Sequence, residues 1–396
     1  MDIYYQSKKF KRLLQRYEEL RDNNISEFLD SEDLTDVAEY YYSIGQDEKA
    51  LDTANYTNHL YPTATAPLAF KARMALLTYN NPTLANEIAE TIVDKSDLDY
   101  LYLKAEIMIA DNQVSKADQY LQEQYDNVID EDDHEEFAID AAALFADYEE
   151  IDYAEKWLNQ STMINEDEYK EIKVRILKGQ GKYEASETLI NELIDGNPYS
   201  CAYWNQLTQI QFLRNDVQGA ITSSEYALAI NPNDEEALLN KANGLFSLDN
   251  FVESLKYYQQ YRQTCHHVDF SIIDVTIGHL YLILGHPKEA LDFYFQSITE
   301  SENKDQALIN VAISIFDNGY FELTYRILIN YLPNAAKDWT EGFAYLARCC
   351  YELKKTEEYK QFLQIAIERN PRECQDVLSD LYPPGTDIKD YPSINI

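Results

Sequence analysis

The chain has 396 residues and is strongly acidic, with 70 Asp and Glu against 33 Lys and Arg and a formal net charge of −37. A nucleic-acid surface or an anionic lipid surface is bound through clustered basic residues, so neither is expected as a partner. A basic partner, in contrast, would be attracted. The length exceeds that of one compact globule, which predicts several domains or a repeat array.

The lack of a recognisable targeting signal and the cysteine content together predict a cytoplasmic protein. The N-terminal stretch MDIYYQSKKFKRLLQ lacks the apolar segment and cleavage site of a signal peptide, and the chain has no long apolar run. The five cysteines are odd in number and do not have the spacing of a disulfide framework. Free cysteines of this kind are usual in a reducing compartment.

The first element in chain order is a helix within residues 1–30. Phe10, Leu13, Tyr17 and Leu20 fall on one face of it, so we expect an N-terminal capping helix. A second capping helix is expected at residues 372–384, where PRECQDVLSDLYPPG ends in two prolines. Residues 385–396 show no periodicity, which predicts a loose tail.

Between the two caps, residues 31–371 repeat with a period near 34 residues. Pro198 and Pro232 end two similar apolar runs and set that period. Extending it in both directions predicts about ten units, which start near Ser31, Ala66, Leu98, Glu135, Asp167, Cys201, Glu235, Ser271, Asp305 and Thr340.

Each unit has the pattern of two amphipathic helices that pack on each other. The fifteenth position is often glycine, which suits a left-handed residue after the first helix, as at Gly45, Gly181, Gly285 and Gly319. Small residues recur where two helix backbones should approach. At the eighth position these are Ala38, Ala105, Ala142, Ala242, Gly278, Ala312 and Ala347, and at the twentieth Ala50, Ala85, Ala117, Ala154, Ser186, Ala220, Ser254 and Ala290.

This pattern resembles the tetratricopeptide repeat family. The matching stretches include YWNQLTQIQFLRNDVQGAITSSEYALAINPND (203–234) and IGHLYLILGHPKEALDFYFQSI (277–298). The resemblance implies an all-α fold, a right-handed superhelical solenoid of antiparallel helix pairs in which each pair buries its apolar face against its neighbours. Arg73 and Tyr359 depart from the pattern because they occupy positions that are small in other units. For Arg73 a shift of one residue would restore the match.

Two stretches suggest binding chemistry but are better explained by the repeat. Gly278 and Gly285 frame a helix, and Lys288 is not followed by Ser or Thr, so this is not a phosphate loop. The acidic stretch IDEDDHEEF (129–137) lacks the alternating ligands and central glycine of a calcium loop. Its carboxylates suit the start of a helix instead.

Two cysteine-containing stretches also fall short of a site. CHHVD (265–269) brings together three side chains that can bind metal, but no second pair completes a four-ligand zinc site. Cys350 holds a core position, and its neighbour Cys349 has no His nearby in sequence that would activate a catalytic thiol. We therefore expect no enzyme, no catalytic, metal-binding or cofactor-binding residue, and no cofactor.

By resemblance to the family, a partner binds on the concave face, at first-helix positions two, five, nine and twelve. Ile272 is one of several apolar residues at these positions in the later units, and an exposed apolar stripe usually marks an interaction surface. The predicted protein-binding groove consists of Asn205, Gln209, Phe212, Leu239, Asn243, Phe246, Val275, His279, Leu282, Ile309, Ile313, Phe316, Arg348 and Tyr351. In the N-terminal half the same positions are acidic and should attract basic residues, at Glu32, Glu39, Asp99, Glu106, Glu136, Glu168 and Glu171.

The sequence thus predicts a non-enzymatic scaffold or adaptor, or more specifically a chaperone-like holder, for a protein or peptide with apolar anchors and basic residues. The alternative is a ligand- or metal-responsive sensor or enzyme accessory with a site near Cys265, His267 and His279. Self-association through a flank is a third interpretation. The phenylalanines of the groove, Phe212, Phe246 and Phe316, could equally be core between units.

Overall fold

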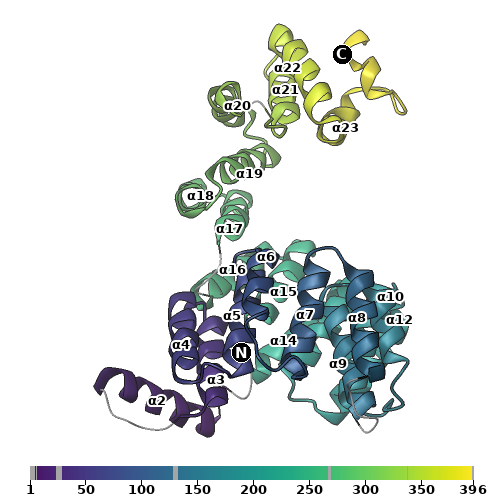
Figure 1. The fold of residues 1–396 in the computed structure, drawn as a ribbon. Coiled ribbons are helices and arrows are strands. Elements are labelled where there is room, and N and C mark those ends of the chain that lie inside the picture. Colours follow the sequence, from purple (N-terminus) through teal and green to yellow (C-terminus); the bar gives the residue numbers. More distant parts are fainter. Residues whose placement is uncertain are drawn as a thin grey trace. The chain divides into compact units, whose positions relative to one another are not determined.

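The computed structural model describes residue 5 and residues 7–23, 29–127, 133–265, 269–336 and 338–394. Within these residues all regular secondary structure is helical and no strand occurs, which confirms the all-α prediction (Figure 1). The chain divides into two compact units, Met1–Asp216 (unit 1) and Val217–Ile396 (unit 2). In the described part no helix is long and apolar enough to cross a membrane.

Unit 1 is a series of helices that can be followed from purple to blue in Figure 1. Each consecutive pair from α3/α4 to α11/α12 packs face to face. The helices are α2 (Lys8–Asn23), α3 (Ser31–Ser43), α4 (Asp47–Leu60), α5 (Thr65–Leu77), α6 (Pro82–Ala89), α7 (Leu98–Ala110), α8 (Val114–Asn127), α9 (His134–Asp147), α10 (Ile151–Leu158), α11 (Asp167–Gly179), α12 (Tyr183–Gly196) and α13 (Cys201–Leu213).

Unit 2 continues the series from teal to yellow in Figure 1, with consecutive pairs from α15/α16 to α21/α22. Short 3-10 turns follow α20 and α23. The elements are α14 (Val217–Ile230), α15 (Glu235–Ser247), α16 (Phe251–Thr264), α17 (Ser271–Ile283), α18 (Pro287–Glu300), α19 (Lys304–Asp317), α20 (Phe321–Tyr331), η2 (Leu332–Asn334), α21 (Phe343–Glu352), α22 (Thr356–Arg369), α23 (Pro371–Leu378), η3 (Ser379–Leu381) and η4 (Ile388–Ser393).

The predicted unit starts agree closely with the starts of the first helices. Six of them coincide: Ser31, Leu98, Asp167, Cys201, Glu235 and Ser271. Three others differ by one residue, and the last first helix begins at Phe343 rather than Thr340. The delay follows from Gly342, whose φ of +86° precedes the helix. The Glu373 carboxylate then accepts hydrogen bonds from the backbone N–H groups of Gly342 and Ala344, which satisfies the start of α21.

The turn after every first helix has the same backbone conformation. The fifteenth residue of each predicted unit has a positive φ, and this includes the six units in which that residue is not glycine. Glycine holds this place at Gly45, Gly181, Gly285 and Gly319, and other residues hold it at Asn80, Asn112, Glu149, Asn215, Asp249 and Lys354. A left-handed residue at this place ends a helix by closing its last carbonyl groups. The left-handed backbone conformation therefore recurs more regularly along the chain than any one residue type does at this position.

The small residues mark the contact between the two helices of a pair. The alanines predicted at positions eight and twenty are 0% exposed throughout. Where position twenty is Ser or Thr, its hydroxyl donates to the carbonyl oxygen at position eight, as from Ser186 to Val174 (2.9 Å) and from Ser254 to Ala242 (2.9 Å). Backbone approach of this kind leaves no room for a larger side chain.

Gly278 shows why one unit has glycine at its eighth position. A Cβ atom there would lie 2.4 Å from Cε1 of Tyr294, which is buried against it on α18. Arg73, which seemed to break the same rule, lies one residue beyond the contact, because Ala72 is the 0% exposed residue. Arg73 forms an ion pair with Glu106 instead, at 3.1 Å.

Both ends of the chain are covered by extra elements. Before the first helix pair, α2 packs on α3, and its Phe10, Leu13 and Tyr17 are buried. At the C-terminus α23 follows the last pair, but the stretch from residue 385 is not the loose tail that we expected. In it, Tyr391 is 2% exposed and stacks on Tyr382 at 3.7 Å between ring centroids. Tyr391 is the one tyrosine in the sequence of this segment, and a single buried residue leaves no periodic apolar pattern from which its burial could be predicted.

The large Tyr359 at a normally small position is accommodated by the same C-terminal segment. Tyr359 is 6% exposed, and its hydroxyl is hydrogen-bonded to that of Tyr382. The core of the chain is accordingly a row of separate clusters between neighbouring helices rather than one central core. Stability in such arrays depends on contacts between neighbours.

Candidate binding surface on the first helices

Three successive first helices of unit 2 line a cavity of about 380 Å³, which we call the apolar pocket. Most of its wall is aliphatic or aromatic, and Ile272 at its rim is 65% exposed. Its residues come from α15, α17 and α19 and are Phe246, Ile272, Val275, Thr276, His279, Asn310, Ile313, Ser314 and Asp317. Four of them, Phe246, Val275, His279 and Ile313, belong to the groove predicted from the sequence.

A short polar chain crosses the wall of the apolar pocket. The Asn318 side-chain amide donates to the Ser314 carbonyl oxygen at 2.9 Å and lies 2.9 Å from Nδ1 of His279. Because the amide nitrogen can only donate, Nδ1 accepts, and the hydrogen of the neutral ring lies on Nε2. The Ser314 hydroxyl also contacts Nδ1 (3.2 Å) and the Tyr294 hydroxyl (2.7 Å). The network fixes the ring of His279 and leaves Nε2–H as the one hydrogen-bond donor of the ring.

Asp317 links the apolar pocket to a second cavity of about 400 Å³, which we call the aromatic–acidic pocket. Three half-buried rings form part of it: Phe316 lies 5.3 Å from Phe321 and 5.1 Å from Tyr345, measured between ring centroids. The wall is completed by α21 and α23, and its residues are Phe316, Asp317, Gly319, Phe321, Tyr345, Arg348, Asp376, Val377 and Asp380. Phe316 and Arg348 belong to the predicted groove.

The one cation in the wall of the aromatic–acidic pocket is already paired. Arg348 donates from Nε to Glu352 (2.8 Å), and its Nη1 contacts both the Asp380 carboxylate and the Val377 carbonyl oxygen. Within the part of the chain that the structure describes, Asp317 and Asp376 form no ion pair and accept no hydrogen bond. Burial raises the pKa of Asp317, and a positive charge on His279 would oppose this rise.

The remaining residues of the predicted groove have other surroundings. Ile309 is 0% exposed and Asn205 4% exposed, so neither is available at a surface. Gln209 accepts a hydrogen bond from Lys178 at 2.8 Å in unit 1. Asn243 and Tyr351 are exposed, while the others are half-buried against the core, namely Phe212, Leu239 and Leu282. Phe246 and Phe316 are half-buried as well, so each contributes both to a pocket wall and to packing between units.

Sequence reasoning missed several pocket residues that lie beside the predicted stripe. Tyr345 and Asp317 hold positions six and thirteen of their units, which are three residues before and four residues after position nine. The stripe is therefore wider than the four positions assumed, and spacing by three or four residues could have included them. Phe321 and Asp376 come from other helices, α20 and α23, so no first-helix pattern could indicate them.

Unit 1 has a larger cavity on its first helices, of about 800 Å³. It is rich in carboxylates, but most of these are held by neighbours. Arg73 and the Tyr148 hydroxyl both contact Glu106, at 3.1 and 3.2 Å. Its lining residues are Arg73, Leu77, Leu98, Asp99, Tyr102, Glu106, Asp140, Ala143, Leu144, Asp147 and Tyr148.

The other carboxylates of this cavity show the same pairing. The Tyr102 hydroxyl donates to Asp140 at 3.0 Å, and Arg175 lies 2.6 Å from Asp147. Burial raises the pKa of Asp140, with a further rise from Glu136 and Glu168. Burial also raises the pKa values of Glu32 and Glu39, next to other acidic side chains of α3 and α7. The acidic first-helix surface expected in the N-terminal half is present, and two of its carboxylates, Glu106 and Glu171, accept hydrogen bonds from tyrosine hydroxyls.

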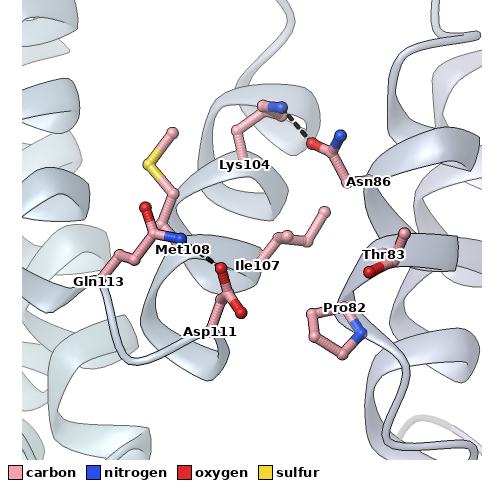
Figure 2. Close-up of a pocket in the computed structure, with 8 residues that line it drawn as sticks. All are labelled: Pro82, Thr83, Asn86, Lys104, Ile107, Met108, Asp111 and Gln113. Carbon is pink, nitrogen blue, oxygen red and sulfur yellow. Dashed lines mark hydrogen bonds between the residues drawn. The ribbon is translucent and has the colours of Figure 1, made fainter.

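A third cavity, of about 340 Å³, lies between α6 and α7 in unit 1 (Figure 2). Lys104 reaches across it, but its ammonium group is bonded to Asn86 (2.6 Å) and to Glu90 (2.8 Å). The lysine holds two helices together, and the cavity offers no free charge for an anionic ligand.

The residues of the alternative sensor site do not form a common centre in the described chain. Cys265 is 4% exposed and its thiol contacts Glu235 at 3.2 Å, while His279 is held by Ser314 and Asn318. His266 and His267 lie outside the described residues. Among the residues that the structure describes, no group of three or more His, Cys, Asp or Glu side chains could hold a metal ion.

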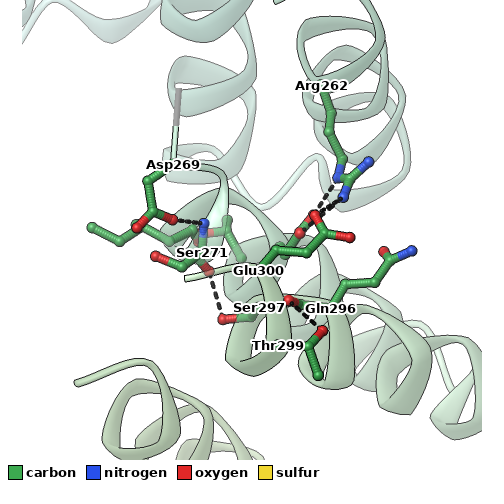
Figure 3. A network of polar contacts seen from close by, with 10 residues as sticks. Arg262, Asp269, Ser271, Gln296, Ser297, Thr299 and Glu300 are labelled. Carbon is green, nitrogen blue, oxygen red and sulfur yellow. Dashed lines mark hydrogen bonds and ion pairs between the residues drawn. The ribbon is translucent and has the colours of Figure 1, made fainter. Parts of the chain in front are cut away.

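The polar groups near this region have a structural role (Figure 3). Asp274 is 0% exposed and is bonded to Arg262, whose second nitrogen also lies 3.3 Å from Glu300. These contacts tie α16, α17 and α18 together. Elsewhere, burial raises the pKa values of Cys349 and Cys350 to about 12, which keeps both thiols protonated and unreactive.

No family model matches the sequence, and no curated protein matches it either. Solved structures with a likeness include YrrB, titled a TPR protein with an unusual peptide-binding site, at 13% identity and a TM-score of 0.35 over 49% of this chain and 98% of that one. The PilF protein of Pseudomonas aeruginosa has 13% identity and a TM-score of 0.40 over 54% of this chain and 98% of that one.

The APC/C hetero-tetramer Cut9–Hcn1 gives 13% identity and a TM-score of 0.37 over 95% of this chain and 88% of that one. At such TM-scores no property of these proteins transfers to this chain. The repeat is established within each unit by the described helices, through five consecutive helix pairs in unit 1 and four in unit 2 that share one turn geometry. A series of helix pairs of this kind is what the sequence resemblance implied.

Proposed function

We propose that this protein is a non-enzymatic scaffold that binds a segment of another protein on the first helices of unit 2. The apolar pocket carries this proposal, because it is open to solvent and lined by three consecutive first helices. Ile272, 65% exposed at its rim, is an apolar side chain that solvent exposure would disfavour without a partner. Filling the pocket with a large apolar side chain would contribute about 2 kcal/mol.

A chaperone-like holder of basic or amphipathic clients is the more specific form of the same proposal. It is supported by the formal net charge of −37, which attracts basic chains over a distance. We further propose a cytoplasmic location, consistent with five free cysteines.

The test is selection of binders from a displayed library of random 12-residue peptides on the full-length protein. The variant Ile272→Asp should lose the selected peptides, because a carboxylate at the rim opposes burial of an apolar side chain. Val252→Asp is the matched control: Val252 is 64% exposed and is likewise the second residue of its helix, α16, but lies outside the pocket. Equal binding by the wild type and Ile272→Asp would refute the proposal.

A further inference from the structure

We propose that the aromatic–acidic pocket binds an Arg or Lys side chain of the partner, next to the apolar anchor. This proposal rests on the proposed function, since it concerns the same bound segment. The first observation is the wall itself: Phe316, Phe321 and Tyr345 are half-buried rings around one cavity of about 400 Å³. An aromatic ring attracts a cation that lies over its face, so rings that line a cavity can contribute to binding one.

The second observation is the charge around these rings. Asp317 and Asp376 line the cavity and are not ion-paired within the described residues, while the charge of Arg348 is engaged by Glu352 and Asp380. Burial raises the pKa of Tyr345 to about 12, with a further rise from the nearby charges of Asp317, Glu373 and Asp376. The two aspartates therefore act on the ring that lines the cavity. A cationic side chain would find both a ring surface and two uncommitted carboxylates there.

The third observation is the continuity of the two pockets. Asp317 lines both of them, and the walls on α19 are formed by Ile313 on one side and Phe316 on the other. These residues are three positions apart on one helix, which corresponds to a rise of about 4.5 Å. A single short segment can therefore place an apolar side chain in one pocket and a cationic side chain in the other. The selectivity of the site would come from this pairing, since an apolar pocket alone discriminates weakly.

Other polar features of the molecule do not compete with this one. The carboxylates of the unit 1 cavity are mostly held by tyrosine hydroxyls and arginines. The cavity between α6 and α7 has its lysine engaged on both sides. A fourth cavity, of about 600 Å³ between α20 and α22, has its own cation, Arg369, which lies 4.7 Å above the Phe343 ring and donates to the Trp339 carbonyl oxygen.

The experiment uses the peptides selected on the full-length protein. We expect them to carry an Arg or Lys within a few residues of an apolar side chain. A synthetic copy with citrulline in place of Arg removes the charge at equal length, and one with norleucine in place of Lys removes the charged terminal nitrogen and keeps the four carbons. Its binding should weaken about tenfold, as expected for a cation between rings and carboxylates. The measurement is fluorescence anisotropy of the labelled peptide.

The double variant Asp317→Asn/Asp376→Asn should bind the charged peptide about tenfold less tightly and lose most of its preference over the uncharged copy. The control Asp292→Asn/Glu357→Gln changes the net charge equally on exposed parts of α18 and α22 and should bind as the wild type does. If the uncharged copy binds the wild type as tightly as the charged peptide, the cationic pocket is refuted. Continued sensitivity to Ile272→Asp would then leave the proposed function standing. If no peptide depends on Ile272, both proposals fail.

Discussion

The first-helix cavities of the two units differ in how their carboxylates are used. In unit 1 the cavity is larger and more acidic, yet Glu106, Asp140 and Asp147 are each contacted by a tyrosine hydroxyl or an arginine. In unit 2 the two pockets are smaller, at about 380 and 400 Å³, and Asp317 and Asp376 have no ion pair within the described residues. Acid content alone would therefore place a cation site in unit 1, whereas the site that we propose lies in unit 2.

The difference shows that the strength of a charged site depends on what the charges already contact. A carboxylate that accepts a hydrogen bond from a neighbouring repeat has exchanged water for that donor, and a ligand must compete with it. Tyr102 and Tyr148 hold neighbouring first helices together in unit 1 in this way. We interpret the first-helix surface of unit 1 as mainly structural and that of unit 2 as the binding surface.

The largest expected effect tests this assignment directly. Ile272→Asp should weaken binding of a selected peptide about 100-fold, because it opposes the burial that drives association. Leu77→Asp makes the same kind of change in the unit 1 cavity, at a leucine that is 56% exposed, and should leave binding unchanged. Isothermal titration calorimetry measures both. A loss with Leu77→Asp as large as that with Ile272→Asp would overturn the division of roles between the units.

A second, smaller effect concerns packing inside the helix pairs. Gly278→Ala should lower the free energy of unfolding by about 1–3 kcal/mol, because the added Cβ meets the Tyr294 ring. In unit 1 the corresponding residue is Ala142, with Leu158 at the position of Tyr294, so alanine fits there. Chemical denaturation is the measurement. The double variant Gly278→Ala/Tyr294→Leu should recover part of the loss, and a purely additive result would contradict the steric explanation.

The smallest effect is electrostatic and belongs to unit 1. Burial and the charge of Asp36 raise the pKa of Glu39, so its proton is held more tightly in the folded chain than in the unfolded chain. Stability from this group therefore falls as the pH rises through its folded pKa. Glu39→Gln should raise the melting temperature at pH 7 by roughly 2–4 °C if the relief is about 1 kcal/mol. The gain should disappear near pH 4, as followed by circular dichroism; a gain independent of pH would contradict the charge explanation.

Much of the fold could be predicted because the repeat imposes the same requirements ten times. The small residues at positions eight and twenty, such as Ala242 and Ser254, are separated by a fixed twelve residues and meet in one contact. The left-handed turn follows the same register even where Asn215 or Lys354 replaces glycine. The structure differs from the predicted fold near the C-terminus, where single residues such as Gly342 and Tyr391 make contacts that are not part of the repeat.

The candidate site was only partly predictable. Positions two, five, nine and twelve led to Ile272, Val275 and Ile313, because helical periodicity places them on one face. The same rule included Ile309, which is buried, since periodicity does not separate neighbouring faces of a helix that is covered on two sides.

By itself, the sequence determined the all-α class, the period of the helix pairs and the face of the first helices on which a cavity forms, because these follow from local spacing along one chain. Only the tertiary structure decided which carboxylates are engaged and which are free. Tyr102 and Asp140 are 38 residues apart and meet in one hydrogen bond, whereas Asp317 and Asp376 form no ion pair with any residue that the structure describes. Such pairings depend on how separate helices pack, and no local pattern encodes them.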